Sequence, residues 1–383
     1  MPYIRMIVRK LKKLVFIIDS CLMKLLRRRR YVIFNGTCAM NFTNFKPVYD
    51  QLILDKNIVV YVMNSMADEN FYTQLGVPPE RFISQRAALW KKWDLYIATD
   101  FYSIDFKRRH QSVFISHGVS QKKSIDSDKA FLSGSKLLKF NKVFFSSEKL
   151  YDDFKLELGS PAEQRAVLCG YPRLDKLVQE STDREDIRRE LGITDQKPLI
   201  VFAPTWGEHA ALNAFGEEII QALSELDAHI ILKLHDHLYS DKPIRKNRIN
   251  WANYLDAYKD VPNVHHIRYR DTYPYIKAAD LMIADYGSIV LEYQLLKKPM
   301  VLLSVQEHNN SVVSNKGLLN LLEQASVTIS KPAELKDAVI KGLDDPKLSG
   351  NSAKTKLCEK YFLNVGQATT ILVDNIYPLL DEF

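Results

Sequence analysis

Several features that would assign a function quickly are missing from this sequence of 383 residues. It has no GxGxxG fingerprint, which argues against a dinucleotide-binding site. Its four cysteines, Cys21, Cys38, Cys169 and Cys358, show no CxxC or other metal-ligand spacing, so we expect reduced thiols in a cytosolic protein. No uncharged apolar run approaches the ~18–20 residues that are needed to span a bilayer.

Acidic residues are scarce at one end of the chain only. Residues 1–30 hold ten Lys/Arg and one acid, whereas the remaining 353 residues hold 43 bases and 45 acids. The near-neutral body argues against a nucleic-acid-binding protein. In 1–30 the apolar clusters alternate with basic ones and no cleavage site follows, which disfavours a signal peptide. We expect a helix on an anionic membrane surface, and a solvated or core-docked first helix is the alternative.

The rest of the chain is long enough for two domains. From Tyr31 onward, short apolar runs alternate with helical stretches, which is typical of parallel sheets covered on both faces. The charged run at 181–190 marks a boundary near 178–197. The predicted division is a membrane-surface segment at 1–30, a first domain at 31–178, a second at 197–360, and a helix at 361–383 that packs back on the first domain. The expected strands are 31–34, 58–62, 95–98, 112–115, 143–145, 166–169, 198–202, 229–234, 263–267, 281–284, 300–303 and 327–329.

The most informative stretch is 278–303, which reads as a strand, a polar turn, a helix and a second strand. The turn is Asp285-Tyr286-Gly287-Ser288, and we expect Ser288 to cap the helix. Because the first turn of the helix carries no carboxylate before Glu292, the helix N-terminus is open to an anion such as phosphate. Glu292, one turn further on, could accept hydrogen bonds from ribose hydroxyls. The alternatives are an ordinary capped helix and a surface glutamate.

A second group of polar residues follows the strand at 112–115. His117 and Gly118 come just after the strand, and Lys122 lies close behind them. A histidine at the carboxyl end of a strand, beside a glycine that permits close approach, is a candidate base next to an anion site. The alternative is a structural histidine.

Three further motifs also follow strands. Thr205 comes after 198–202 and could bind a phosphate or cap a helix, and His235 comes after 229–234. His235-Asp236-His237 lacks the additional ligands of a metal site, so no metal is predicted. In the turn after 166–169, Arg173 and Asp175 could pair to fix the chain.

Taken together, these motifs resemble the CDP-glycerol glycerophosphotransferase family of teichoic acid and capsule polymerases and primases. The similarity covers roughly residues 110–305 and rests on the order of five motifs, which are His117-Gly118 with Lys122, Gly170-Tyr171-Pro172-Arg173 with Asp175, Ala203-Pro204-Thr205-Trp206, Leu234-His235, and Asp285-Tyr286-Gly287-Ser288. The family often has Asp where Glu292 stands, and Ser-Ser where this chain has Gly287-Ser288.

The resemblance implies a GT-B fold, with two Rossmann-like domains, attached to the cytoplasmic face of the cell membrane. It implies that His117 and His235 are catalytic, and that Lys122, Thr205, Gly287, Ser288 and Glu292 bind the donor, supported by Gly118, Arg173, Asp175 and Asp285. The expected reaction transfers a polyol phosphate from a CDP-activated donor to a lipid-linked or polymeric acceptor, with neither a cofactor nor a metal. A nucleotide-sugar glycosyltransferase and a non-catalytic binding module are the alternatives, and the oligomeric state is left open.

Overall fold

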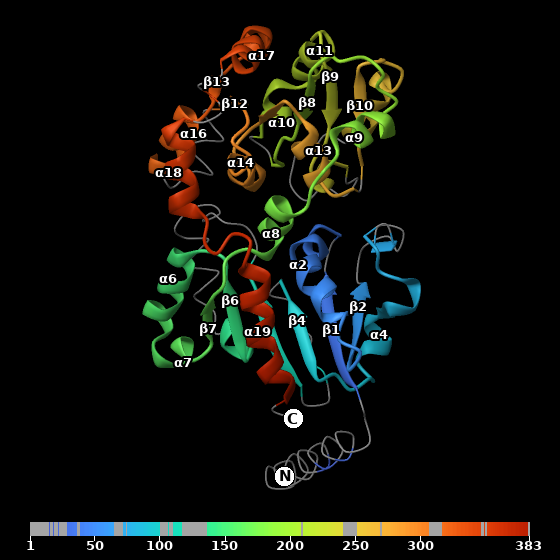
Figure 1. Ribbon diagram of the computed structural model, residues 1–383, viewed down its shortest axis with the longest axis vertical. Coiled ribbons are helices and arrows are strands. Elements are labelled where there is room, and N and C mark those ends of the chain that lie inside the picture. Colours follow the sequence, from blue (N-terminus) through green and yellow to red (C-terminus); the bar gives the residue numbers. More distant parts are fainter. Residues whose placement is uncertain are drawn as a thin grey trace, which may run out of the picture. The chain divides into compact units, whose positions relative to one another are not determined.

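The computed structural model describes most of the chain. The described residues are 29–36, 39–64, 72–73, 75–99, 106, 110–116, 136–207, 210–239, 251–268, 270–305, 316–345, 348 and 351–381, together with Val15, Ile18 and Leu22. They form two compact units (Figure 1). The first unit contains the described residues up to 116, those of 136–176 and those of 363–381, and the second contains 177–362. His117, Gly118 and Lys122 lie outside the described residues.

The first unit is built on a seven-stranded sheet in the order β3-β2-β1-β4-β5-β6-β7, and every neighbouring pair is parallel. Its strands are β1 (Arg30–Gly36), β2 (Ile58–Asn64), β3 (Phe82–Ser84), β4 (Leu95–Ala98), β5 (Gln111–Ile115), β6 (Lys142–Phe145) and β7 (Ala166–Leu168). Its described helices are α2 (Ala39–Leu52), α4 (Gln85–Ala88), α6 (Glu148–Leu158), α7 (Ser160–Glu163), α19 (Ala368–Asp381) and the first half of α8 (Pro172–Gln179), with η1 (Pro79–Arg81) and η2 (Leu137–Lys139).

The second unit is built on a six-stranded parallel sheet in the order β10-β9-β8-β11-β12-β13. Its strands are β8 (Leu199–Phe202), β9 (His229–Leu232), β10 (Val264–His266), β11 (Leu281–Ala284), β12 (Met300–Leu303) and β13 (Val327–Ile329). Its described helices are α9 (Arg184–Glu190), α10 (Ala211–Phe215), α11 (Glu217–Ser224), α12 (Trp251–Leu255), α13 (Tyr273–Ala278), α14 (Ser288–Gln294), α16 (Lys316–Gln324), α17 (Leu335–Asp344) and α18 (Ser352–Tyr361), with η3 (Asp236–Tyr239), η4 (Asp256–Tyr258) and η5 (Pro332–Glu334).

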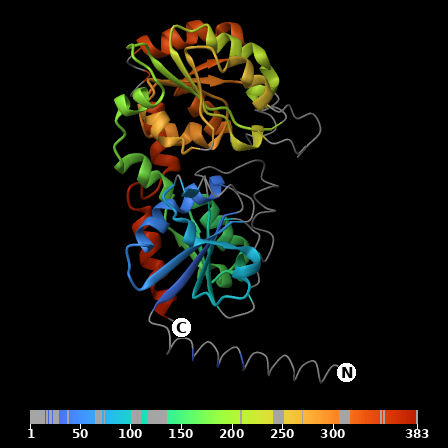
Figure 2. The ribbon, with the colours of Figure 1, turned by 90° about the vertical axis from the view of Figure 1, so that its right-hand side faces the viewer.

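Parallel sheets are buried on both faces, which explains the short uniformly apolar strands. One face of the first sheet packs on α2 and on α19, which supplies Leu372 and Ile376 to the core (Figure 2). The opposite face is filled by aromatic rings, among them Trp93 and Tyr96. The predicted fold class, two parallel-sheet α/β domains, is therefore confirmed. Among the described residues, no helix is long and apolar enough to cross a bilayer.

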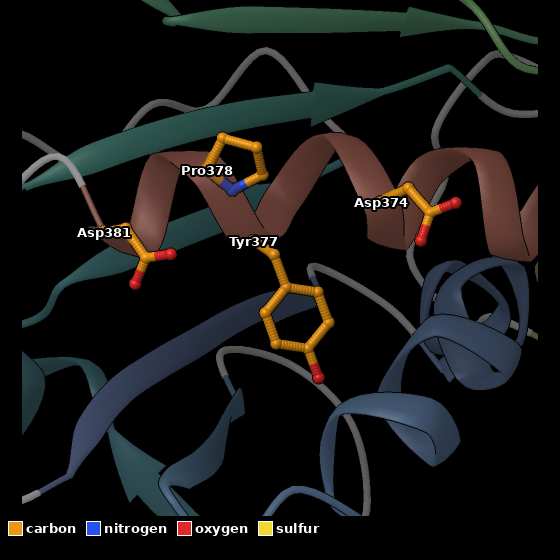
Figure 3. A pocket seen from close by; sticks show the side chains of 4 residues that line it. All are labelled: Asp374, Tyr377, Pro378 and Asp381. Atoms are coloured by element: carbon orange, nitrogen blue, oxygen red, sulfur yellow. The ribbon is translucent and has the colours of Figure 1, made fainter.

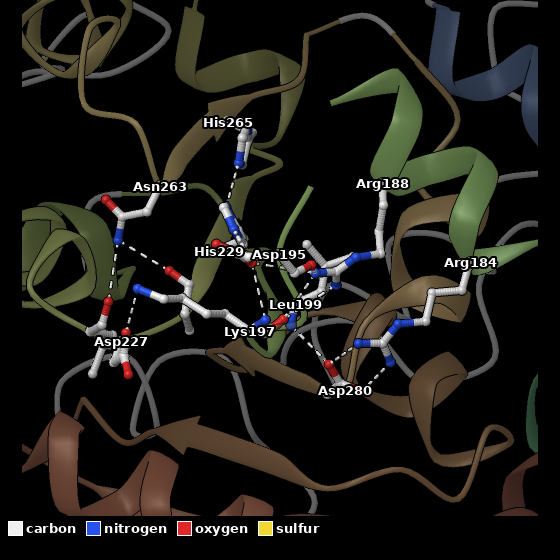
Figure 4. A network of polar contacts seen from close by, with 12 residues as sticks. Arg184, Arg188, Asp195, Lys197, Leu199, Asp227, His229, Asn263, His265 and Asp280 are labelled. Atoms are coloured by element: carbon white, nitrogen blue, oxygen red, sulfur yellow. Dashed lines mark hydrogen bonds and ion pairs between the residues drawn. The ribbon is translucent and has the colours of Figure 1, made fainter. Parts of the chain in front are cut away.

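A polar network closes the amino edge of the second sheet (Figure 4). Asp280, just before β11, accepts hydrogen bonds from the Arg184 guanidinium and from Leu199 N at 2.8 Å. The His229 ring bridges the Asp195 carboxylate at 2.9 Å and the His265 ring at 3.0 Å. These contacts join the starts of four adjacent strands, β10, β9, β8 and β11. The loops that carry the candidate site lie at the opposite, carboxyl edge of the sheet.

This network predicts that the protein loses stability below neutral pH. Burial, reinforced by the neighbouring His229, lowers the pKa of His265 from 6.5 to about 4. Between these pH values the unfolded chain binds a proton that the folded chain does not, so the free energy of unfolding falls as the pH drops from 6.5 to about 4. We expect a loss of about 1–2 kcal/mol after screening. Urea titrations at pH 7.5 and 5 measure it.

His265→Gln is the control, since it keeps a hydrogen-bonding group and does not titrate. An equally steep pH dependence in this variant would place the effect elsewhere.

Candidate functional site

Three loops meet at the carboxyl edge of the second sheet. They follow β8, β9 and β11, which are adjacent in the order β9-β8-β11. Since the carboxyl ends of parallel strands share one edge, Thr205, His235 and the Asp285–Ser288 turn come from neighbouring strands. Ligands of open α/β sheets bind at this edge.

The Asp285 carboxylate joins two of these loops. It is 0% exposed and accepts hydrogen bonds from Thr205 N at 2.6 Å and from Ala211 N, the first residue of α10, at 2.7 Å. A buried carboxylate that accepts N–H bonds is held in one orientation, and its removal would leave both N–H groups without this acceptor. Asp285 therefore fixes the position of Thr205 relative to the turn that begins α14.

The turn itself is packed closely against Thr205. A Cβ added to Gly287 would lie 3.3 Å from Thr205 Cβ and 3.4 Å from its Oγ1, so a side chain there would push the two loops apart. Gly287 is also the N-cap of α14, and as a glycine it supplies no side-chain cap. The expectation that Ser288 caps α14 is wrong, because Ser288 is the first residue within the helix. The first turn of α14 carries no acid, so its N–H groups and dipole favour an anion.

Glu292 lies one turn into α14 and is only 3% exposed, which excludes the surface-glutamate alternative. Its Oε2 accepts a hydrogen bond from the Tyr273 hydroxyl at 2.8 Å, and Tyr273 is itself buried. Tyr273 begins α13, which follows β10 at the same edge of the sheet. This contact orients the carboxylate from a neighbouring element.

His235 is half-buried beside Trp206, with ring centroids 5.8 Å apart. The chain turns into η3 directly after His235, whose carbonyl accepts from Leu238 N at 2.8 Å. Lys233, two residues earlier, is 6% exposed. A histidine and a lysine thus follow β9, and an indole follows the neighbouring β8, a combination suited to an anionic ligand with a ring or an apolar part.

Next to this group, Tyr239 and His266 are joined by a 2.6 Å hydrogen bond, and the Arg268 guanidinium lies 4.5 Å from the Tyr239 ring centroid. Burial, followed by Arg268 and Lys233, lowers the pKa of His266. The two cations act in the same direction as burial and Asp256 acts against them, and the net effect favours a neutral imidazole at neutral pH.

The Gly170 to Asp175 motif lies in the first unit and supports α19. The Asp175 carboxylate, 3% exposed, accepts from Gly366 N at 2.7 Å and from Thr369 N at 2.6 Å. These partners lie about 190 residues away, around the start of α19, whereas we expected Asp175 to pair with Arg173 in the local turn. Arg173 is likewise buried, at 6% exposure.

A pocket on the surface of α19 plays no part in this arrangement. Its lining residues, Asp374, Tyr377, Pro378 and Asp381, all lie on that helix in the first unit (Figure 3). None of them is a predicted site residue.

Comparison with known proteins identifies the family of this chain. The sequence profile described as CDP-glycerol:poly(glycerophosphate) glycerophosphotransferase matches residues 42–310. The chain belongs to this family. The matched range of the glycerophosphotransferase family contains every predicted site residue from His117 to Glu292.

Two relatives are the teichoic acid ribitol-phosphate polymerases TarK and TarL of Staphylococcus aureus. TarK is 26% identical over 298 residues, which cover 72% of this chain and 55% of TarK. TarL is 23% identical over 355 residues, which cover 87% of this chain and 60% of TarL. The chain spans between half and two thirds of the length of these relatives.

A solved structure of the wall teichoic acid polymerase TagF superimposes with a TM-score of 0.65 at 16% identity, over 98% of both chains. At this identity the likeness concerns the fold alone. It confirms the GT-B fold expected from the family resemblance.

Tyr273 and Trp206 illustrate which contacts of the site escaped the sequence analysis. Tyr273 stands in a Thr-Tyr-Pro sequence that signals only a helix start, and its contact with Glu292 spans 19 residues. Trp206 was noted as part of a motif, but its contact with His235 depends on β8 and β9 being neighbours.

Proposed function

We propose that the protein transfers glycerol phosphate, or a related polyol phosphate, from a CDP-activated donor to a hydroxyl group of a lipid-linked or polymeric acceptor. CMP is released, and the product belongs to a teichoic-acid-like or capsular polymer. The observation that carries the proposal is the junction of Thr205, Gly287 and the uncapped start of α14 around the Asp285 carboxylate. It is the part of the family's matched range best suited to a pyrophosphate.

In this reaction the acceptor oxygen attacks the donor's β-phosphorus, the bond from that phosphorus to the CMP oxygen breaks, and CMP leaves. His117 takes the acceptor proton, while Thr205, Lys122 and the α14 N–H groups bind the phosphates. Glu292, oriented by Tyr273, accepts from the ribose, and His235 lies near the departing phosphate. Positioning and fixed charge supply the rate, with no metal or cofactor.

The donor is tested by release of CMP or UDP from a panel of activated compounds. The two Staphylococcus aureus relatives are named for ribitol phosphate, and other relatives for glycerol phosphate, so CDP-glycerol and CDP-ribitol come first. CMP release with mass transfer to a polyol-phosphate acceptor supports the proposal. UDP release from a nucleotide sugar would instead identify a glycosyltransferase, and release from neither donor would favour a binding module.

Gly287→Val should weaken CDP-donor binding by about tenfold. The added side chain meets Thr205 at 3.3 Å and separates the loops that hold the phosphates. Isothermal calorimetry with the donor measures the affinity, and the melting temperature verifies the fold. Ser288→Ala is the matched control with a smaller expected effect, because Ser288 does not cap α14. Unchanged affinity in a folded Gly287→Val protein would remove the phosphate site from this turn.

We also propose that the enzyme works as a peripheral protein on the cytoplasmic face of the membrane, held by residues 1–30. The described residues Val15, Ile18 and Leu22 are helical and more than half exposed, and their i, i+3, i+7 spacing places them on one helix face. An apolar face together with ten bases is the pattern of an interfacial helix.

Deleting residues 1–28 should move the protein from the membrane to the soluble fraction. The deletion ends before β1, which begins at Arg30, so the sheet keeps all of its strands. Each base near an anionic surface contributes about 1 kcal/mol, so the loss of most of them should release the protein. Sedimentation with and without a high-salt wash measures the distribution. A truncated protein that still pellets with membranes after the wash would refute the assignment.

A further inference from the structure

The amino edge of the first sheet is the place where residues 1–30 join the fold. All seven strands are parallel, so their amino ends lie along one edge, and β1 enters it at Arg30. β1 lies between β2 and β4 (Figure 1). The turns that precede β2 and β4 therefore flank the point where the basic segment meets the sheet.

Both flanking turns expose large apolar side chains. Leu54 is 77% exposed and Ile53 is 45% exposed in the turn before β2, and Trp90 is 68% exposed in the turn before β4. Adjacent strands are ~4.8 Å apart, so β2 and β4 are separated by about 10 Å. By contrast, Trp93 and Trp251 are fully buried. Trp90 is hydrogen-bonded to the end of α4, which packs on β2 and β3, so the exposed leucine and indole both belong to connections that lead to the amino edge next to β1.

Bases accompany these apolar residues. Lys56 is exposed beside Leu54, and Lys91 follows Trp90, with its Nζ 3.7 Å from the Tyr61 ring centroid. The acid within the first turn, Asp55, is half-buried and accepts from Asn57 N at 2.8 Å and from the Tyr377 hydroxyl at 3.3 Å. The carboxylate of this turn is therefore engaged within the protein, while Lys56 faces solvent.

We propose that Leu54 and Trp90 are lipid-contacting anchors, and that the amino edge of the first sheet rests on an anionic bilayer. This inference rests on the membrane attachment proposed above and extends it from the first 30 residues to a surface of the folded domain. Three observations favour lipid as the occupant. Exposed Trp and Leu flanked by Lys is the composition of an interfacial surface, the surface adjoins a segment with ten bases and one acid, and that segment's described apolar residues are exposed as well.

The test uses the full chain and vesicles of phosphatidylglycerol and phosphatidylcholine, with brominated acyl chains as fluorescence quenchers. The tryptophan fluorescence of the wild-type protein should be quenched when it binds these vesicles. The difference in quenching between the wild type and Trp90→Phe gives the contribution of Trp90. Leu54→Ser and Trp90→Ser should each lower vesicle partitioning about tenfold. Ile340→Ser, at a 49% exposed position on α17 of the second unit, is the matched control and should partition normally.

The inference is overturned if the full-length protein binds vesicles without quenching of Trp90 and the Leu54→Ser variant partitions normally. That result would leave the attachment by residues 1–30 intact. If the 1–28 deletion binds vesicles as well as the full chain does, the attachment proposed above fails instead. A Leu54→Ser protein that changes oligomeric state in light scattering, with normal vesicle binding, would make this surface an interface between copies and also overturn the inference.

Discussion

His117→Ala should lower kcat by about 10²–10⁴-fold and leave the affinity for the CDP-activated donor nearly unchanged. A general base acts mainly in the transition state, so its loss reduces turnover far more than ground-state binding. The residue directly before it is firmly held. Ser116 N donates to Phe144 O at 2.9 Å, and the Ser116 hydroxyl accepts from Ser146 N at 2.9 Å. The strand end that precedes His117 is therefore a rigid support.

Two other histidines serve as comparisons for this variant. His110 precedes β5 at its amino end, so His110→Ala should keep normal turnover. His235→Ala should lower both donor affinity and turnover, since we propose that His235 lies near the departing phosphate. Turnover, calorimetric donor affinity and melting temperature are measured on the same preparations. Near-normal turnover in a stable His117→Ala protein would end its assignment as the base, and a joint loss of stability and donor affinity would make it a structural residue.

Gly170→Ala should destabilise the first unit by about 3–5 kcal/mol, or roughly 10 °C in melting temperature. The backbone of Gly170 has φ +90°, which other residues rarely adopt, and an added Cβ would lie 2.3 Å from the carbonyl oxygen of Leu363. That carbonyl leads into α19, so the clash separates α19 from the sheet that it covers.

Gly76→Ala is the control that separates the effect of a positive φ from the effect of the contact with Leu363. Gly76 lies in the same unit with φ +80°, and nothing would lie within 4 Å of an added Cβ. It should cost about 1 kcal/mol through backbone strain alone. If Gly170→Ala were no more destabilising than Gly76→Ala, the close approach of Leu363 would be irrelevant to stability.

Most strands could be predicted because strands that are buried on both faces appear in the sequence as short apolar runs. β4, β11, β12 and β13 have the predicted bounds, and the other predicted strands differ by one or two residues at one or both ends. β3 was missed, since it is only three residues long and none of them is fully buried. A short edge strand leaves no apolar run to recognise.

The site was less accessible to sequence reasoning, because its contacts join distant segments. The polar turn at 285–288 was recognised locally, but the bond from Asp285 to Thr205 spans 80 residues. The cap of α14 was assigned to Ser288 because serine is a common N-cap, whereas the N-cap is Gly287 and the helix begins one position earlier than predicted, at Ser288 itself. Asp175 shows the same limit, since its partners follow almost two hundred residues later.

The position of α19 sets an order of events during synthesis. The ribosome completes residues 177–362, which hold the whole described second unit, before it reaches α19. Until then the face of the first sheet that receives Leu372, Ile376 and Leu380 is covered only in part, by α2. The domain that is made first therefore finishes folding last, and it exposes apolar surface to chaperones while the second domain is being translated.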